Sequence, residues 1–310
     1  MLALYAAPRT PQVVEIREAP DPTPSAHEAL VRVRATSLNL GETRRTSQAT
    51  DAWRPGWDVA GEVLQAAADG TGPAAGTRVV GLVRSGAWAE QAAVPTKWLA
   101  PIPDKVSFAD AATLPVAGLT AFKALAVGGL LVGKDVLVTG ASGGVGQFAV
   151  QLGAIAGARV TAVVSRPERV ESVARLGAAE TIVGLAMSGS SYDLVIESLA
   201  GPVLAAALMR LRPGGTIVSF GSSSREPSTF NLNDLSGQSG SRTLYYKFTV
   251  FEELERQPTG DRDLAALARL IGDGKLDPLV SLEVSWHDAT RAVQALLNRQ
   301  VLGKAVLAID

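Results

Sequence analysis

The 310-residue chain contains no cysteine and only two histidines. The absence of cysteine excludes disulfide bonds, thiolate metal sites and cysteine nucleophiles. The two histidines, His27 and His287, lie far apart in the sequence, and a zinc site normally takes several nitrogen or sulfur ligands from the protein. The sequence therefore predicts no metal site.

Excess charge and long apolar runs are also missing. The formal net charge is −1 and the sequence pI is about 6.2, so the composition predicts neither a nucleic-acid partner nor a membrane surface. No segment reaches the roughly 18 uninterrupted apolar residues of a membrane helix, and the first residues lack the basic and apolar regions of a signal peptide. These absences lead us to expect a cytoplasmic protein, and a hydrophobic content of 47% predicts a substantial core.

The most informative stretch that is present runs from residue 136 to residue 152. Residues 136–138 form the apolar, β-branched run of a buried parallel strand, glycines follow at positions 140, 143, 144 and 146, and apolar residues then recur at helical spacing. A strand, a glycine turn and a helix in this order make a phosphate cradle, because the helix N-terminus offers unpaired N–H groups. We predict that the pyrophosphate of a dinucleotide is held by Ser142, Gly143, Gly144, Val145 and Gly146.

The same turn also fits a different chemistry. Gly140, Ser142 and Gly144 spell G-x-S-x-G, the nucleophile turn of a serine hydrolase, and Asp234 and His287 follow in the chain order of that family. No other part of the sequence resembles such a hydrolase. A Ser142 hydrolase is therefore kept as the less favoured alternative.

The pattern of expected elements divides the chain into two domains. Strands are expected at 12–18, 29–34, 58–64, 77–83 and 87–94, which is typical of a barrel-like β domain. Ser107 has the character of a helix cap. After it, helices alternate with strands: the helices are expected at 120–126, 167–176 and 202–211, and the strands at 159–164, 181–183, 194–197 and 216–220. A strand at 244–250, a helix at 264–271 and a final β-α-β unit at 279–284, 288–298 and 305–309 follow. We predict an α/β fold with a doubly wound parallel Rossmann sheet in residues 116–255 and a β-rich domain formed by 1–115 with 256–310.

The end of the second strand of the Rossmann domain indicates which dinucleotide binds. The acidic residue that would hold an NAD ribose is expected about 20 residues beyond the glycines, but that place carries Ser165 and Arg166, with Arg169 one turn later. A hydroxyl and two guanidiniums suit a 2′-phosphate, so we predict NADPH. In a second interpretation, which is compatible with the first, Ser165 and Glu168 form a capping box around Pro167.

Further segments, in order along nearly the whole chain, carry a family resemblance: 31–39 (VRVRATSLN), 55–61 (PGWDVAG), 86–90 (GAWAE), 112–121 (ATLPVAGLTA), 141–146 (ASGGVG), 176–178 (LGA), 212–215 (RPGG) and 303–307 (GKAVL). Together they resemble the medium-chain dehydrogenase/reductase superfamily and, within it, the zinc-free quinone oxidoreductase branch. The resemblance implies a GroES-like β-rich barrel domain beside the Rossmann domain. Zinc-dependent relatives carry a cysteine about where Asn39 stands and a histidine about where Trp57 stands. Their absence here leaves hydride transfer to a quinone or to an α,β-unsaturated carbonyl.

The resemblance also implies roles for individual residues. Thr120 resembles the threonine that contacts the nicotinamide, and Asn39 resembles an asparagine that orients either the ribose or the substrate carbonyl. The remaining positions carried over to cofactor binding are Ser198, Leu199, Phe220, Gly221 and, as a cofactor-binding or structural residue, Lys304.

The proton donor is not identified by the sequence. Enoyl-reducing relatives often have a tyrosine downstream of the position of Glu42, and residues 43–54 contain none. Candidates are Glu42, Arg44, Arg45, Tyr245 and Tyr246, and water is a further source. Asn39, Glu42 and Thr120 are the predicted catalytic residues.

The predicted partners are a small, apolar, electron-poor substrate and, as the resemblance implies, a second copy of the chain, which pairs through the edge strand near 244–250. A non-catalytic NADPH-binding protein, of a sensor or crystallin-like kind, is the principal alternative to the enzyme.

Overall fold

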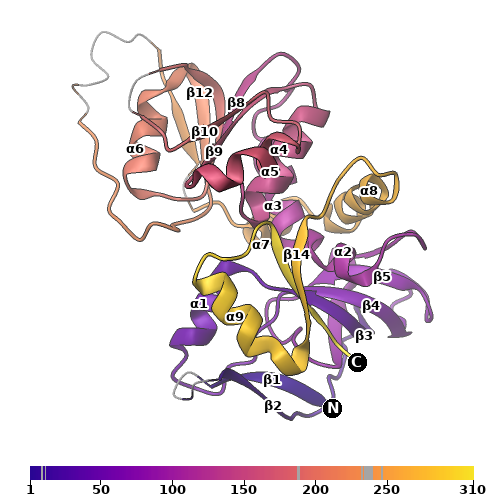
Figure 1. Cartoon of the computed structure of the whole chain (residues 1–310). Helices are drawn as coiled ribbons and strands as arrows, with labels where there is room; N and C mark the ends of the chain where they lie inside the picture. Colours follow the sequence, from indigo (N-terminus) through magenta and orange to yellow (C-terminus); the bar gives the residue numbers. More distant parts are fainter. Residues whose placement is uncertain (8–9, 11, 187–188, 232, 234–239, 246) are drawn as a thin grey trace. The chain divides into compact units, whose positions relative to one another are not determined.

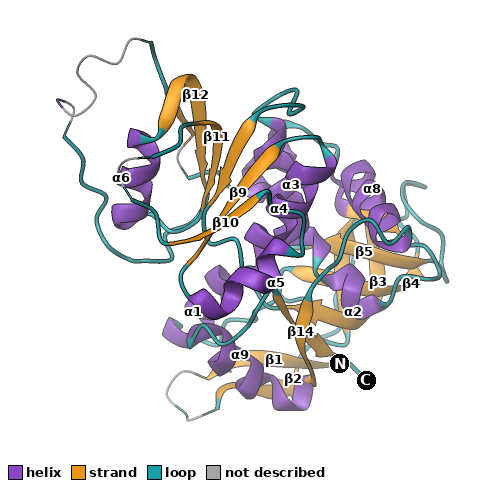
Figure 2. Ribbon diagram, turned by 45° about the horizontal axis from the view of Figure 1, so that its top comes forward, coloured by secondary structure: helices purple, strands orange, loops and turns teal. Residues whose placement is uncertain are grey.

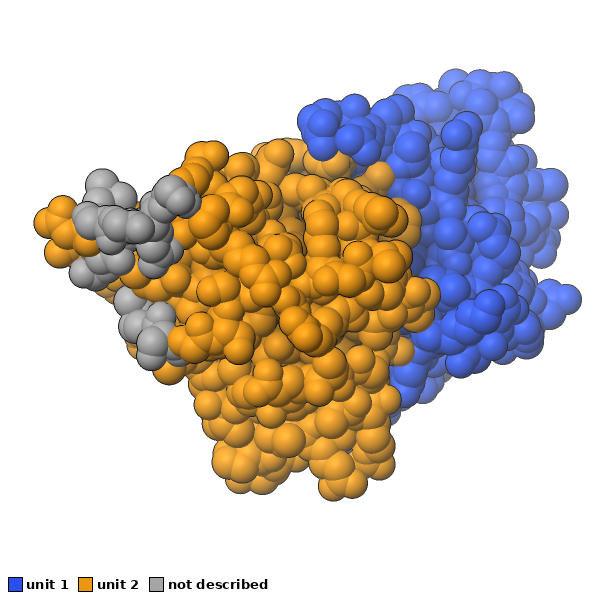
Figure 3. Space-filling view, turned by 90° about the horizontal axis from the view of Figure 1, so that it is seen from above, with its two compact units in different colours: residues 1–119, 254–310 blue, residues 120–253 orange. Residues whose placement is uncertain are grey.

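The computed structural model describes the chain except residues 8–9, 11, 187–188, 232, 234–239 and 246. It forms two compact units, one made of Met1–Leu119 with Leu254–Asp310 and the other of Thr120–Glu253, which Figure 3 colours separately. Among the described residues, no helix is long and apolar enough to cross a membrane.

The first unit is built on a seven-stranded sheet in which only β14 and β15 pair in parallel and the other neighbours are antiparallel (Figure 1). The order is β14-β15-β3-β4-β5-β7, with β6 paired to β3. The strands are β3 (Glu28–Ser37), β4 (Asp58–Gln65), β5 (Arg78–Leu82), β6 (Gln91–Pro95), β7 (Leu99–Pro101), β14 (Val280–Ser285) and β15 (Lys304–Ala308). Because the last strand inserts beside β3, residues from the two ends of the sequence become neighbours.

Short helices and a separate hairpin complete this unit. The hairpin consists of β1 (Leu2–Ala7) and β2 (Val13–Glu18), and the helices are α1 (Leu40–Gln48), α2 (Phe108–Ala112), α8 (Gly260–Gly272) and α9 (Ala289–Leu297). A π-helical turn, Leu114–Gly118, follows α2. Buried valines of the sheet pack with Trp88 and Trp286 in the core. The predicted cap at Ser107 is confirmed, since its hydroxyl accepts from the Asp110 amide at 3.0 Å.

The second unit is a six-stranded parallel sheet with helices on both faces (Figure 2). Its strand order is β10-β9-β8-β11-β12-β13, the doubly wound order in which successive strands are added to one side of β8 and then, from β11 on, to its other side. The strands are β8 (Asp135–Val138), β9 (Arg159–Val164), β10 (Glu180–Val183), β11 (Tyr192–Glu197), β12 (Leu211–Ser219) and β13 (Thr243–Tyr245), and the helices are α3 (Leu119–Ala126), α4 (Gly144–Ile155), α5 (Val170–Ala174) and α6 (Gly201–Met209). The predicted fold class is confirmed.

Several predicted elements differ in extent. The strand expected at 87–94 begins only at Gln91, because Ala89 instead forms a bridge with Ala3 of β1. The helix expected at 167–176 divides into a 3₁₀ turn, Pro167–Arg169, and the short α5. The strand expected at 244–250 is limited to β13, because helix α7 (Val250–Arg256) starts at its far end.

Candidate functional site

The glycine turn between β8 and α4 is folded as tightly as its sequence suggests. Gly140 has φ +60°, which favours glycine, and its carbonyl accepts the Gly143 amide at 2.9 Å. A Cβ on Gly146 would overlap the Gly140 carbonyl oxygen and lie 2.7 Å from the Ala141 Cα. Gly146 therefore lets the start of α4 pack directly against the turn.

The open side of this turn fits a diphosphate. A Cβ on Gly143 would meet a single atom, the Gly140 carbonyl oxygen at 3.3 Å, so a ligand can approach the backbone closely there. Gly143 is also the N-cap of the 12-residue helix α4, and no side chain caps that helix end. The N–H groups and the positive dipole end of the first turn are thus directed at an anion.

The residues predicted to recognise a 2′-phosphate lie next to this turn. Arg169 donates from Nη1 to the Ser142 hydroxyl at 2.8 Å, which links the end of the second strand to the phosphate turn, while Ser165 and Arg166 are exposed just beyond β9. The capping box of Ser165 with Glu168 is wrong. The 3₁₀ turn begins one residue later than that motif requires, so its N-cap is Arg166, and no side-chain hydrogen bond caps this end.

A third loop at the carboxyl ends of the strands contains Ser198, Leu199, Phe220 and Gly221. The Ser198 amide donates to the Thr139 hydroxyl at 3.0 Å, and the Ser198 hydroxyl donates to the Thr139 carbonyl at 3.2 Å. A Cβ on Gly221 would lie 2.5 Å from the Ser198 carbonyl oxygen. These contacts hold the ends of β8, β11 and β12 together at the topological switch point, where doubly wound sheets bind ligands.

Glu197, which sequence reasoning missed, organises the same loop. Its fully buried carboxylate accepts from the amides of Leu199 at 2.6 Å and Ala200 at 2.9 Å, and from the hydroxyls of Thr139 and Ser219. Burial raises the pKa of Glu197, and these four donors act in the opposite direction. A charged residue directly after the apolar run 194–196 was the available signal.

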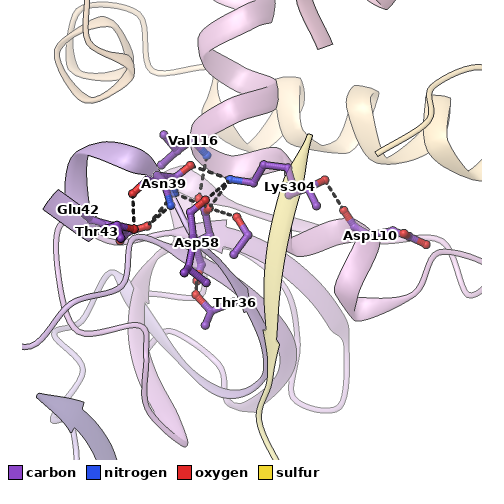
Figure 4. Close-up of polar contacts among 11 residues, drawn as sticks. Thr36, Asn39, Glu42, Thr43, Asp58, Asp110, Val116 and Lys304 are labelled. Atoms are coloured by element: carbon purple, nitrogen blue, oxygen red, sulfur yellow. Dashed lines mark hydrogen bonds and ion pairs between the residues drawn. The ribbon is translucent and has the colours of Figure 1, made fainter. Parts of the chain in front are cut away.

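In the first unit, a buried polar cluster gathers around Asp58 (Figure 4). Its carboxylate accepts from the Val116 amide at 2.9 Å, from the Asn39 side chain at 2.7 Å and from the Ser37 hydroxyl. Lys304 Nζ lies 3.8 Å from Asp58 Oδ2 and donates to Asn39 Oδ1 at 2.8 Å. Three of the predicted residues, Asn39, Glu42 and Lys304, are therefore brought together by Asp58, whose role the sequence did not reveal.

The hydrogen bonds of Asn39 determine what its amide can do. Both protons of Nδ2 are donated, one to Glu42 Oε1 at 2.9 Å and one to Asp58 Oδ2 at 2.7 Å. The amide oxygen accepts from Lys304 and faces the backbone amide of Glu42 in the capping box that opens α1. The side chain is 9% exposed. In this arrangement Asn39 has no N–H group left to donate.

Burial shifts the pKa values of all three ionisable groups of the cluster. Loss of solvation raises the pKa of Glu42 to about 8, and the nearby Asp58 charge acts in the same direction. Desolvation also raises the pKa of Asp58 and lowers that of Lys304, and in each case the opposite charge of the other partner works against the shift. Burial thus favours the neutral form of a carboxyl group in this cluster.

The remaining predicted residues are not part of these clusters. Thr120 lies near the start of α3 and is 5% exposed. Arg44 and Arg45 line a pocket of about 480 Å³ beside Trp53, whose ring lies 4.5 Å from the Arg45 guanidinium carbon. Tyr245 is about half exposed on β13, and Tyr246 lies outside the described residues.

The residues of the hydrolase alternative have other partners. The Ser142 hydroxyl accepts from Arg169, and His287 Nε2 lies 3.8 Å from the Asp310 carboxylate. Asp234 is outside the described residues. Over the part of the chain that the structure describes, no three His, Asp or Glu side chains gather in a way that would hold a metal ion.

Two family models match the chain. The alcohol dehydrogenase GroES-like domain matches residues 25–104, and the zinc-binding dehydrogenase family matches residues 144–256. The first match lies in the β-rich unit and the second begins at the helix that follows the glycine turn.

Several relatives are similar over nearly the whole of this chain. Quinone-oxidoreductase QR1, chloroplastic, of Triphysaria versicolor is 30% identical over 94% of this chain and 92% of its own length. Acryloyl-coenzyme A reductase of Metallosphaera sedula is 25% identical over 96% of each chain. The spectinabilin polyketide synthase system protein NorB of Streptomyces orinoci is 32% identical over 89% of this chain, which spans only 13% of that protein.

Among solved structures, mycobacterial Rv1454c complexed with NADPH superposes with a TM-score of 0.87. It is 27% identical, and the similarity covers 99% of this chain and 100% of that one.

Proposed function

The chain belongs to the medium-chain dehydrogenase/reductase superfamily, in its quinone oxidoreductase-like branch, and on this premise we propose that it is an NADPH-dependent, zinc-independent oxidoreductase. Its acceptor is a quinone or an α,β-unsaturated carbonyl. The observation that carries the proposal is the glycine turn of residues 140–146, which is open to an anion on one side and tied to Arg169 through Ser142.

The cofactor is held chiefly by backbone in this proposal. The amides of residues 143–146 bind the diphosphate, and Ser165, Arg166 and Arg169 take the 2′-phosphate, because guanidinium forks match phosphate oxygens. Ser198, Leu199, Phe220 and Gly221 border the ribose and the nicotinamide, and Thr120 contacts the nicotinamide. NADPH bound to the similar mycobacterial protein supports the choice of cofactor.

The saturated donors of Asn39 favour one of its two predicted roles. A substrate carbonyl needs an N–H donor, and both N–H groups of Asn39 are already used by Glu42 and Asp58. We therefore assign Asn39 to the ribose and Lys304 to the support of Asn39.

The bound cofactor supplies the hydride, and the chain contributes binding, orientation and exclusion of water. A quinone or an enone takes up a hydride and a proton, and water supplies that proton in this proposal. The names of the similar quinone oxidoreductase and acryloyl-coenzyme A reductase support both acceptor classes. Both acceptor classes include small, apolar, electron-poor molecules, which is the kind of substrate that we propose.

We also propose a homodimer formed through β13. This strand is the outermost described strand of the six-stranded sheet, and its Leu244 and Tyr245 are 46% and 48% exposed. An exposed apolar edge strand is a template for pairing with another strand. Light scattering tests the pairing: wild type should have the mass of a dimer and the Leu244→Lys variant that of a monomer.

A cytoplasmic location stays a prediction from the sequence.

The central test is a titration of the purified protein with NADPH and NADH, followed by assays with 1,4-naphthoquinone and 2-alkenals. We expect tighter binding of NADPH and oxidation of NADPH with at least one acceptor class. A protein that shows no NADPH binding at high micromolar concentration would falsify the proposal. Binding without turnover over a broad acceptor panel would favour the non-catalytic alternative.

A further inference from the structure

The buried cluster contains more negative than positive groups. Glu42 of α1 and Asp58 of β4 are carboxyl groups, Lys304 of β15 is the single cation, and each is at most 2% exposed. The ammonium of Lys304 donates to the Leu38 carbonyl at 2.9 Å and to Asn39, and it forms its ion pair with Asp58. Glu42 receives no bond from a cation. The cluster is neutral only if one of its two carboxyl groups is protonated.

The geometry around Glu42 indicates that this residue carries the proton. Its Oε1 accepts from the backbone and side-chain nitrogens of Asn39, both at 2.9 Å, whereas its Oε2 is buried and has no hydrogen-bond partner. An ionised carboxylate with one bare oxygen in the interior is strongly disfavoured. In the neutral acid, Oε1 is the carbonyl oxygen that accepts both bonds and Oε2 carries the hydrogen.

We propose that Glu42 is a positioning residue, whose neutral form fixes the orientation of the Asn39 side chain that the proposed function assigns to the cofactor. This inference rests on the proposed NADPH-dependent function. Glu42 acts through Asn39 and does not itself touch cofactor or substrate, because its side chain is fully buried.

Ionisation of Glu42 would disturb this arrangement through Lys304. A second buried carboxylate would compete with Asp58 and with Asn39 Oδ1 for the one ammonium group, and Asn39 would lose its fixed orientation. Helix α1 also packs against β1, β2 and α9. Their charged side chains are Glu15, Arg17, Glu18 and Arg291, which are half-buried or exposed, so they do not replace the missing cation.

The test measures the dissociation constant of NADPH from pH 6 to pH 9.5 for wild type and for Glu42→Gln. Glutamine keeps an acceptor for Asn39 and cannot ionise. With a pKa of about 8 for Glu42, wild type is expected to bind NADPH about tenfold more weakly at pH 9 than at pH 7, and Glu42→Gln is expected to lose this decline. Glu62→Gln is the matched control, because Glu62 lies on β4 beside the surface residue Arg34, at 3.3 Å, and should retain the wild-type profile.

A second measurement reads the protonation state of Glu42 directly. Wild type labelled with ¹³C-glutamate should show an infrared carbonyl band of a neutral glutamic acid at pH 6.5 that is missing from Glu42→Gln, which separates it from any band of the buried Glu197, and this band should disappear by pH 10. Absence of the band at pH 6.5 overturns the inference, as does a Glu42→Gln variant with the wild-type pH profile. If wild type binds no NADPH at any pH, the proposed function itself fails, whereas an unchanged pH profile with normal binding refutes only the role of Glu42.

Discussion

The close packing of α4 against the phosphate turn leads to a prediction for Gly146→Ala. Since the added Cβ would overlap the Gly140 carbonyl oxygen and lie 2.7 Å from the Ala141 Cα, either the turn or the start of the helix must move by about 1 Å. Overpacking of this kind costs about 1–3 kcal/mol, and replacing glycine inside a helix returns about 0.5–1 kcal/mol. We expect a net loss of about 1–2 kcal/mol in the free energy of unfolding and an NADPH affinity at least tenfold weaker.

Gly143→Ala is the matched substitution three residues earlier. Its backbone has an ordinary φ of −91°, and its Cβ would meet only the Gly140 carbonyl oxygen at 3.3 Å. The stability should stay within about 0.5 kcal/mol of wild type. The methyl group would occupy the open side of the turn, so NADPH binding should still fall.

Urea denaturation of the cofactor-free protein and a fluorescence titration with NADPH separate the two effects. Gly146→Ala should lose stability and binding, whereas Gly143→Ala should lose binding alone. The reasoning is refuted if Gly146→Ala is as stable as wild type, or if Gly143→Ala binds NADPH with unchanged affinity.

Three further predictions concern charged groups. Replacing Arg166 or Arg169 by alanine should weaken NADPH binding about 10–100-fold and leave NADH binding unchanged in the same titration; equal losses for both cofactors would contradict the assignment. Asp58→Asn and Lys304→Met should each cost about 3–5 kcal/mol in urea denaturation, because each leaves its buried partner uncompensated, and the double variant should cost less than the sum. The pKa of Glu42 is raised from 4.5 to about 8, so its proton stabilises the folded state. This contribution to the free energy of unfolding is on the order of 5 kcal/mol. It is present in full below about pH 4.5 and is lost as the pH rises through 8. Urea midpoints from pH 5 to pH 9 should therefore fall more for wild type than for Glu42→Gln, and parallel curves would exclude this linkage.

The phosphate turn was predictable because its determinants are contiguous. Gly140, Gly143 and Gly146 act on one another over seven residues, and the strand and helix that flank them have clear periodicities. The link between Arg169 and Ser142 needed the fold, because it depends on the direction in which the short 3₁₀ turn leaves β9.

The Asp58 cluster was predictable only in part. The family resemblance named Asn39, Glu42 and Lys304, but their mutual bonds depend on the insertion of β15 beside β3, which joins residues 265 positions apart. Helix α1 was missed because its sequence, LGETRRTSQ, has no apolar stripe. Its buried face consists of Glu42, Thr43 and Thr46, and the two threonine hydroxyls bond to carbonyl oxygens within the helix.

The hydrogen bonding of this cluster also restricts the reaction. Asn39 has no donor left, and the Glu42 side chain is fully buried, so neither residue can protonate a bound substrate. Hydride addition to a simple ketone produces a strongly basic alkoxide, which requires a positioned acid or a metal ion. Hydride addition to a quinone or an enone instead produces a delocalised, weakly basic oxyanion that water can protonate. The arrangement of Asn39 and Glu42 therefore favours conjugated acceptors over isolated ketones, independently of the names of similar proteins.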